Sequence, residues 1–254
     1  MSQAPLPGSG FRLDLDPHDA RKLQAKARLQ SRRQHNEARY ALDPWAFLCE
    51  AVWTLNQQGI GGGIQQYPGH SMVDLAPHCD CGGCENYLHH VTNRWHGARR
   101  ILIPKSRRLL ATWTLVALHY WLARYSSASL IAFAARKQGQ TEEEGSAELV
   151  KRAKFIHDHL PLDVQPRPIR YGFARFTFLD NESTIVGVAQ GADQARQYTF
   201  TAYLADEFAF WERAGETYAA LLPTLEGGGR FTGCSSATPG FMEQLVYDSW
   251  ATGE

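Results

Sequence analysis

One stretch of this sequence constrains the fold more than any other: a short apolar run passes into a cationic turn and then into a long helical pattern. The run is Ile101-Leu-Ile103, the turn carries Lys105, Arg107 and Arg108, and the helical pattern begins near Thr112. A strand–turn–helix order of this kind presents backbone N–H groups at a helix N-terminus, where phosphate groups bind. A nucleotide site also needs a cation for the phosphates and a hydroxyl for Mg²⁺. This segment supplies both.

The usual phosphate-loop pattern, G-x-x-x-x-G-K-[ST], is not met here. Counting back from Thr112, Ala111 stands where the pattern has Lys, and Leu110 stands where it has Gly. Lys105 lies at the end of the apolar run, and a long side chain starting there can curl over the same phosphates. Taken alone, the segment is equally compatible with a solvated basic turn before an amphipathic helix.

A second apolar run supplies the acidic groups that the first one lacks. It extends from Thr199 to Ala205, ends in Asp206-Glu207, and is followed by the apolar residues Phe208 to Trp211. Adjacent carboxylates in apolar surroundings are costly unless they hold a cation or move a proton. One of the pair would therefore hold the Mg²⁺ of ATP, and the other would orient or deprotonate the attacking water.

Strand and helix patterns alternate along the rest of the chain, which predicts a mostly parallel sheet covered on both faces. Helices are expected over about 16–35, from Pro44, over 85–96, 112–125 and 141–159, and before Gly227. Strands are expected over 101–103, 130–133, 199–205 and 230–235, with a hairpin formed by 173–179 and 183–188.

In this order, the motifs resemble the large subunit of tailed-phage terminases, the ATPase that drives DNA into a procapsid. The loop from Lys105 to Trp113 is similar to that family's deviant phosphate loop. Further similar segments are 134–137, 154–161, 204–210, 222–224 and 236–240, so that the resemblance covers roughly residues 40 to 250. It implies an α/β P-loop NTPase fold of the ASCE type, with a mostly parallel central sheet flanked by helices.

The resemblance also implies a role for individual residues. Glu207 would be the catalytic carboxylate, while Thr112 and Asp206 would hold the Mg²⁺ of ATP. Arg196, eleven residues before Glu207, corresponds to an arginine finger that acts on the neighbouring subunit's ATP; without the resemblance it reads as a solvated loop charge. The implied nucleotide-binding loop is Lys105, Ser106, Arg107, Arg108, Leu109, Leu110, Ala111 and Thr112, and the implied coupling motif is Ser236, Ala237 and Thr238.

The partners implied by the resemblance are double-stranded DNA, the portal protein and the small terminase subunit. A homo-oligomeric ring, a pentamer in this family, is implied as well. Terminase large subunits usually continue into a nuclease domain, which is not recognisable in this sequence, so nuclease activity is not predicted for the chain. The expected location is the host cytoplasm, with transient attachment to the procapsid.

Composition indicates an ordinary folded protein, since 44% of the 254 residues are hydrophobic and 20% are charged. The expected organisation is a partly helical, basic N-terminal extension over 1–40 and an ATPase domain over 41–254 with an irregular insertion at about 58–84. The net charge is zero, but the extension is locally cationic. Its six basic residues, Arg21, Lys22, Lys26, Arg28, Arg32 and Arg33, suit either a solvated helix face or contact with DNA or a partner. No apolar run approaches the length of a membrane span.

The cysteines fall into two groups. Cys49 and Cys234 lie in apolar sequence and are expected to be buried thiols. Cys79, Cys81 and Cys84 lie within six residues, next to His78, and would suit a structural zinc ion, free thiols in a loop, or a disulfide. The spacing leaves all three readings open.

Two other classes of protein remain compatible with the sequence. A helicase-like nucleic-acid translocase would share Asp206-Glu207 and Ser236-Ala-Thr238, but it should also carry a second motor domain. A non-hydrolysing nucleotide- or zinc-binding interaction module would explain the missing loop glycines, but not the retained Lys105 and Thr112.

Overall fold

The structure is a computed structural model that describes residues 16–56, 63–67, 87–106, 109–136, 142–236 and 238–252. The expected zinc ligands His78, Cys79, Cys81 and Cys84 lie outside the described residues. So do Arg107 and Arg108 of the phosphate loop and Ala237 of the coupling motif.

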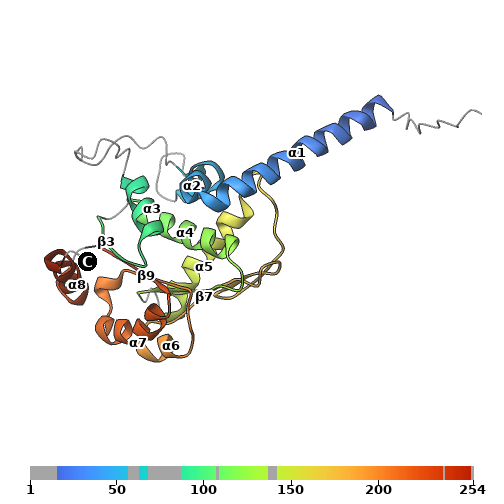
Figure 1. Ribbon diagram of the computed structural model, residues 1–254. Coiled ribbons are helices and arrows are strands. Elements are labelled where there is room, and N and C mark those ends of the chain that lie inside the picture. The colour runs from blue at the N-terminus through green and yellow to red at the C-terminus, as the bar shows by residue number, and fades with distance from the viewer. Residues whose placement is uncertain are drawn as a thin grey trace, which may run out of the picture.

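A seven-stranded sheet in the order β3-β9-β8-β4-β7-β6-β5 forms the centre of the described chain (Figure 1). The strands β3, β9, β8, β4 and β7 run parallel to their neighbours, and β6 and β5 continue the sheet as an antiparallel edge. Their bounds are β3 Arg100–Pro104, β4 Leu130–Ala135, β5 Ile169–Gly172, β6 Arg175–Phe178, β7 Thr184–Gly187, β8 Ala202–Asp206 and β9 Arg230–Ser235. One additional strand, β9, therefore separates the phosphate-loop strand β3 from the acidic strand β8, as the ASCE type requires.

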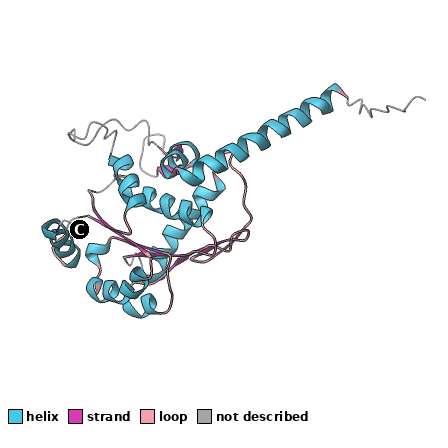
Figure 2. Cartoon of the chain, in the orientation of Figure 1, coloured by secondary structure: helices cyan, strands magenta, loops and turns pink. Residues whose placement is uncertain are grey.

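Helices cover both faces of this sheet, which confirms the predicted α/β class (Figure 2). The strands alternate accordingly: Ile131 and Phe133 of β4 belong to one hydrophobic cluster, and Ala132 and Ala134 belong to the other. The first cluster is covered by α2 Pro44–Ala51, α3 Tyr87–Gly97, α4 Ala111–Tyr125 and α5 Glu142–Asp158. The second is covered by α6 Ala192–Arg196, the 3₁₀ turn η1 Phe208–Phe210, α7 Ala214–Glu226 and α8 Phe241–Thr252.

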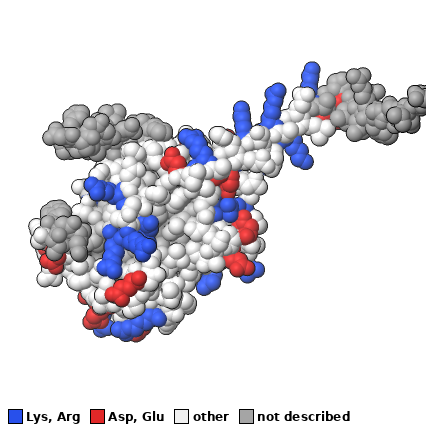
Figure 3. Space-filling view, viewed as in Figure 1, with Lys and Arg blue, Asp and Glu red and all other residues white. Residues whose placement is uncertain are grey.

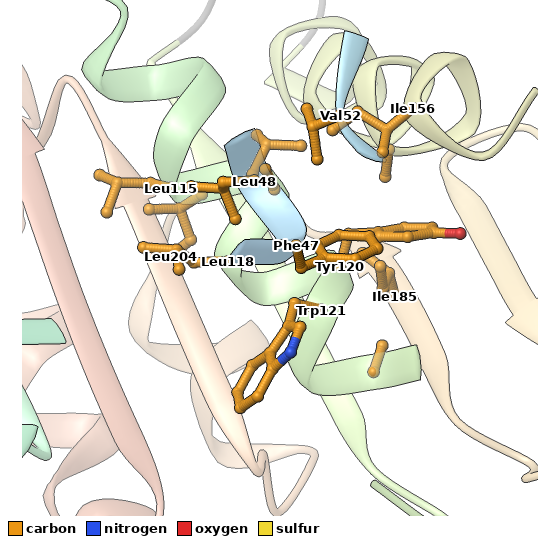
Figure 4. Close-up of a cluster of buried hydrophobic side chains, with 14 of the residues drawn as sticks. Phe47, Leu48, Val52, Leu115, Leu118, Tyr120, Trp121, Ile156, Ile185 and Leu204 are labelled. Carbon is orange, nitrogen blue, oxygen red and sulfur yellow. The ribbon is translucent and has the colours of Figure 1, made fainter. Parts of the chain in front are cut away.

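Helix α4 lies at the centre of the larger cluster. Its Leu115, Leu118 and Tyr120 are fully buried, and they lie among side chains of α2, α5, β7 and β8 (Figure 4). Burying a single side chain of this size contributes about 1.5–3 kcal/mol. The helix that follows the expected phosphate loop is thereby fixed in the core, which also fixes the position of its first turn.

Helix α1 Pro17–Leu42 precedes this core in the chain, and its N-terminal part extends away from the core (Figure 1). Asp43 ends α1 and also begins α2, where its carboxylate accepts the N–H of Ala46 at 2.9 Å. A small antiparallel pair, β1 Trp53–Asn56 and β2 Gly63–Gln66, follows α2.

Most of the expected elements are confirmed, with shifted ends. The strand over 230–235 and the helix that begins at Pro44 are present, and so is the hairpin, as β6 and β7. Helix α1 extends to Leu42 instead of 35, and β8 begins at Ala202 instead of 199. Strand β2 lies inside the segment expected to be an irregular insertion, so the prediction was wrong for Gly63–Gln66.

Two further expectations concern cysteines and membranes. Cys49 and Cys234 are buried thiols, as predicted, and no disulfide is recorded among the described residues. Among those residues, no helix is long and apolar enough to cross a membrane.

Candidate nucleotide site

The candidate site is built where the parallel strands β3, β9 and β8 end at the same edge of the sheet. Pro104 of β3 pairs with Ser235 of β9, and Cys234 pairs with Asp206 of β8. The backbone N–H of Lys105 continues the β3 ladder by donating to the Ser235 carbonyl at 2.9 Å. The residues that directly follow these strands are therefore neighbours, although they are about a hundred positions apart in sequence.

Leu110 closes the phosphate loop in a conformation that glycine normally supplies. Its φ of 57° and ψ of 4° are left-handed, and its carbonyl accepts the N–H of Thr114 at 2.9 Å as α4 begins. A non-glycine residue in this region costs about 1–2 kcal/mol. Leu110 at the N-cap position of α4 makes no side-chain cap, and the N–H groups of a first helical turn have no partner within the helix. Leu110 therefore adopts, without glycine, the left-handed turn that leads into α4.

Thr112 and Asp206 meet across the site. The Thr112 hydroxyl donates to Asp206 Oδ1 at 3.2 Å, linking the first turn of α4 to the end of β8. The sequence predicted that these two side chains would share one cation, and the structure places their oxygen atoms together. Oxygen ligands of this kind suit Mg²⁺.

Glu207 lies on the other side of the site and contacts Lys105. Lys105 Nζ is 3.3 Å from Glu207 Oε1, and the Ser235 hydroxyl lies 3.4 Å from Glu207 Oε2. Glu207 also has a left-handed backbone, with φ 51° and ψ 36°. Strain in a non-glycine residue is retained only where surrounding structure enforces it, and it clusters at functional sites.

Burial and neighbouring charges together shift the pKa of the Asp206 carboxyl group. Asp206 is buried, and loss of hydration raises its pKa above the usual range, although the charge of Lys105 opposes that shift. The neighbouring charge of Glu207 raises the Asp206 pKa further. A bound divalent cation would reverse this balance by favouring the ionised carboxylate.

Two residues near this site were not predicted from the sequence. Ser235, the last residue of β9, is the hydroxyl that reaches Glu207, whereas the predicted coupling residues Ser236 and Thr238 follow the strand. Arg152 of α5 lies over the Trp113 ring, with its guanidinium carbon 5.4 Å from the ring centroid. Burial lowers the pKa of Arg152, and Asp206 is the first carboxylate that opposes this shift. Neither contact has a local sequence signal, because each depends on how α5 and β9 pack.

Arg196 is not brought to this site. It ends α6, its side chain is 66% exposed, and its one recorded ion pair among the described residues is with Asp193 at 3.4 Å. Together with Thr199 and Thr224 it lines a shallow hollow, and Thr199 precedes β8, whereas Asp206 and Glu207 lie at the other end of that strand. Arg196 therefore lies toward the opposite edge of the sheet from the candidate site.

Comparisons with known proteins give a loose structural likeness. No family model matches the sequence, and neither does any curated protein. Two solved structures of the large terminase ATPase domain of Thermus phage P74-26, one of them a point mutant, are similar at 16% and 15% identity, each with a TM-score of 0.45. In each case the likeness covers 62% of this chain and 68% of the other. A likeness this distant does not assign a function to the chain.

Proposed function

We propose that this chain is an ATP-hydrolysing motor domain of the terminase type, which powers packaging of double-stranded DNA into a procapsid. The observation that carries the proposal is the pair of contacts Thr112–Asp206 and Lys105–Glu207, which join a phosphate loop to an acidic strand end. Only the sheet brings these four residues together. Their chemistry is the set that phosphoryl transfer needs.

Each residue then has a defined task. The first-turn N–H groups of α4 and the Lys105 ammonium bind the phosphates, and Thr112 and Asp206 hold Mg²⁺, which neutralises charge on the phosphates. Glu207 orients the attacking water and accepts its proton. Ser235, in contact with Glu207, and Ser236 and Thr238 beyond it, would pass the state of the nucleotide on to DNA movement.

The contact between Lys105 and Glu207 suggests how ATP prepares the site. Lys105 is only 10% exposed, and its recorded ion pair is with Glu207. Arriving phosphates would compete for Lys105 and release the Glu207 carboxylate for water. The catalytic base would then become available only after the substrate has bound.

A direct experiment measures ATP binding and turnover with and without linear duplex DNA. We expect Mg²⁺-dependent hydrolysis that duplex DNA stimulates. Binding without turnover under both conditions would instead favour a non-hydrolysing module, and stimulation by single strands alone would favour a helicase-like translocase.

Within this proposal, Arg196 acts between subunits of a homo-oligomeric ring that engages the portal protein and the small terminase subunit in the host cytoplasm. A guanidinium stabilises the charge of the transferring phosphate, and such fingers contribute roughly 10³-fold or more to the rate. Arg196→Ala and Glu207→Gln chains should each be inactive alone. Activity recovered on mixing them would support action in trans, whereas full activity of Arg196→Ala chains alone would contradict it.

A further inference from the structure

Helix α1 consists of an anchored half and a projecting half. The anchored half is held to the core by side chains from Arg33 onward: Arg33 Nε donates to the Leu162 carbonyl at 2.9 Å, and Asn36 Nδ2 donates to the Asp163 carbonyl at 3.1 Å. Deeper in the same interface, the Trp121 ring N–H donates to the Tyr40 carbonyl at 2.6 Å. These bonds fix the direction in which the rest of the helix leaves the body.

The projecting half extends away from the body and carries Lys and Arg side chains along its length (Figures 1 and 3). We call residues 17–32 the arm. Every residue from Arg21 to Arg28 is exposed, and so is Arg32. The sequence holds no carboxylate between residues 20 and 36. Lys22 has one weak ion pair, with Asp19 at 3.8 Å, and among the described residues no carboxylate is recorded as a partner of Arg21, Arg28 or Arg32.

The charges of the arm lie on one side of the helix. At about 100° per residue, Arg21, Arg28 and Arg32 fall in one row, and Lys22 and Lys26 fall in a second row about 120° away. The opposite side is uncharged and includes Gln24, Gln30 and Gln34. The first row spans roughly 16 Å along the axis at about 1.5 Å per residue.

We propose that the cationic side of the arm binds the phosphate backbone of duplex DNA; the identity of this polyanion rests on the proposed function. Duplex DNA carries about one charge per 1.7 Å of its axis, so its backbone matches a rigid row of cations that needs no base contact. A protein partner would need large apolar or aromatic anchors at the centre of its contact. Between the two cationic rows lie His18, Ala25 and Leu29, so the only large apolar side chain there is that of Leu29. The arm would thus hold DNA in a fixed direction beside the motor without reading its sequence.

The test measures binding of a short labelled linear duplex to the full chain, without nucleotide, over a series of salt concentrations. The triple variant Arg21→Gln, Arg28→Gln, Arg32→Gln should lose about ten-fold or more in affinity at low salt. The slope of log K against log salt should become shallower by about 2 to 3, because each lost phosphate contact removes about 0.9.

Two matched controls separate charge from other effects of substitution. Arg21→Lys, Arg28→Lys, Arg32→Lys keeps the charges and should keep both the affinity and the slope. Gln24→Ala, Gln30→Ala, Gln34→Ala alters the uncharged side and should change neither. DNA-free ATP turnover should be the same in all three variants, since the arm lies apart from the nucleotide site.

The proposal is overturned if the triple Gln variant binds duplex DNA with an unchanged salt slope. It is also overturned if polyglutamate competes with DNA for the arm at equal charge, because the arm would then fit an acidic protein. Failure of the proposed function gives a different result, in which the parent chain binds DNA through the arm but hydrolyses no ATP.

Discussion

Two clusters of buried charge in this molecule have opposite character. At the base of α1, Glu37 accepts hydrogen bonds from Arg124 at 3.0 Å and Arg167 at 2.6 Å, and Arg167 also reaches Asp180 at 3.2 Å. At the sheet edge, Lys105 and Glu207 form one ion pair at 3.3 Å. The Asp206 carboxylate accepts a hydrogen bond from the Thr112 hydroxyl at 3.2 Å, and the Arg152 guanidinium lies over the Trp113 ring.

The difference shows how a site can be distinguished from a structural network. In the α1 cluster, opposite charges are in direct contact, with Glu37 and Arg124 on helices and Arg167 and Asp180 in the segments that flank β5 and β6. In the sheet-edge cluster, the carboxylates belong to consecutive residues, one of them with a left-handed backbone, and the charges are only partly paired. Burial of charge alone therefore says little about function. Strained backbone together with incompletely paired charge indicates a place prepared for a ligand.

The largest effect on stability should come from breaking the α1 cluster. Glu37→Ala leaves Arg124, whose side chain is fully buried, without its carboxylate, and loss of one partner of a buried pair costs on the order of 3 kcal/mol. The control is Glu216→Ala, which removes the exposed partner of Arg213 and should cost about 1 kcal/mol or less. Urea denaturation measures both, and equal losses would contradict the comparison.

Acid should destabilise the α1 side of the molecule through two histidines. Burial lowers the pKa of His119 to about 3 and that of His157 to about 4, while the unfolded chain titrates near 6.5. The unfolded chain therefore binds more protons below pH 6.5, and stability falls as the pH drops toward about 4. The double variant His119→Phe, His157→Phe should flatten this pH dependence of the unfolding free energy. An unchanged slope would show that other groups cause it.

In the sheet-edge cluster, removing a carboxylate should change the stability of the fold in the opposite direction from Glu37→Ala. Because the Asp206 pKa is raised in the folded state, its ionised form opposes folding at neutral pH. Asp206→Asn keeps an acceptor for Thr112 and should stabilise the fold by on the order of 1 kcal/mol, while removing hydrolysis. A loss of stability like that of Glu37→Ala would place Asp206 in a structural network instead.

The smallest effect concerns the strained loop residue. Leu110→Gly removes the left-handed strain but adds freedom to the unfolded chain, so a net gain of less than about 1 kcal/mol is expected. The control Leu109→Gly, at a position without a positive φ, should destabilise the protein. If the two substitutions have equal effects on the melting temperature, the strain at Leu110 has no effect on the stability of the fold.

The sequence predicted which residues meet at the sheet edge better than it predicted the backbone that holds them. The ends of apolar strands carry Lys105, Asp206 and Glu207, and Thr112 lies in the first turn of the helix that follows one of these strands. Because strand ends in a parallel sheet meet at one edge, the proximity of these residues could be inferred. The left-handed backbone of Leu110 could not, because the residue type argues against it.

Parts of the fold were missed for similar reasons. Strand β5 is short, and its Ile169–Gly172 run includes an arginine and a terminal glycine, so the period-2 signal is weak. Helix α8 follows Gly240, whose φ is 149°, and no helix was predicted after the segment assigned to the coupling motif. Ser235 and Arg152 reach the site only through tertiary packing, which no local pattern records.

The central claim is that Glu207 is the catalytic carboxylate of an ATP site. The most direct test measures ATP binding and the rate of ATP turnover in Glu207→Gln beside the parent chain. The amide can still hydrogen-bond water but cannot accept its proton. We expect ATP binding to be retained and turnover to fall by about 10²-fold or more, with Lys105→Ala, in contrast, losing binding and turnover together. Turnover of Glu207→Gln within a few-fold of the parent would contradict the account.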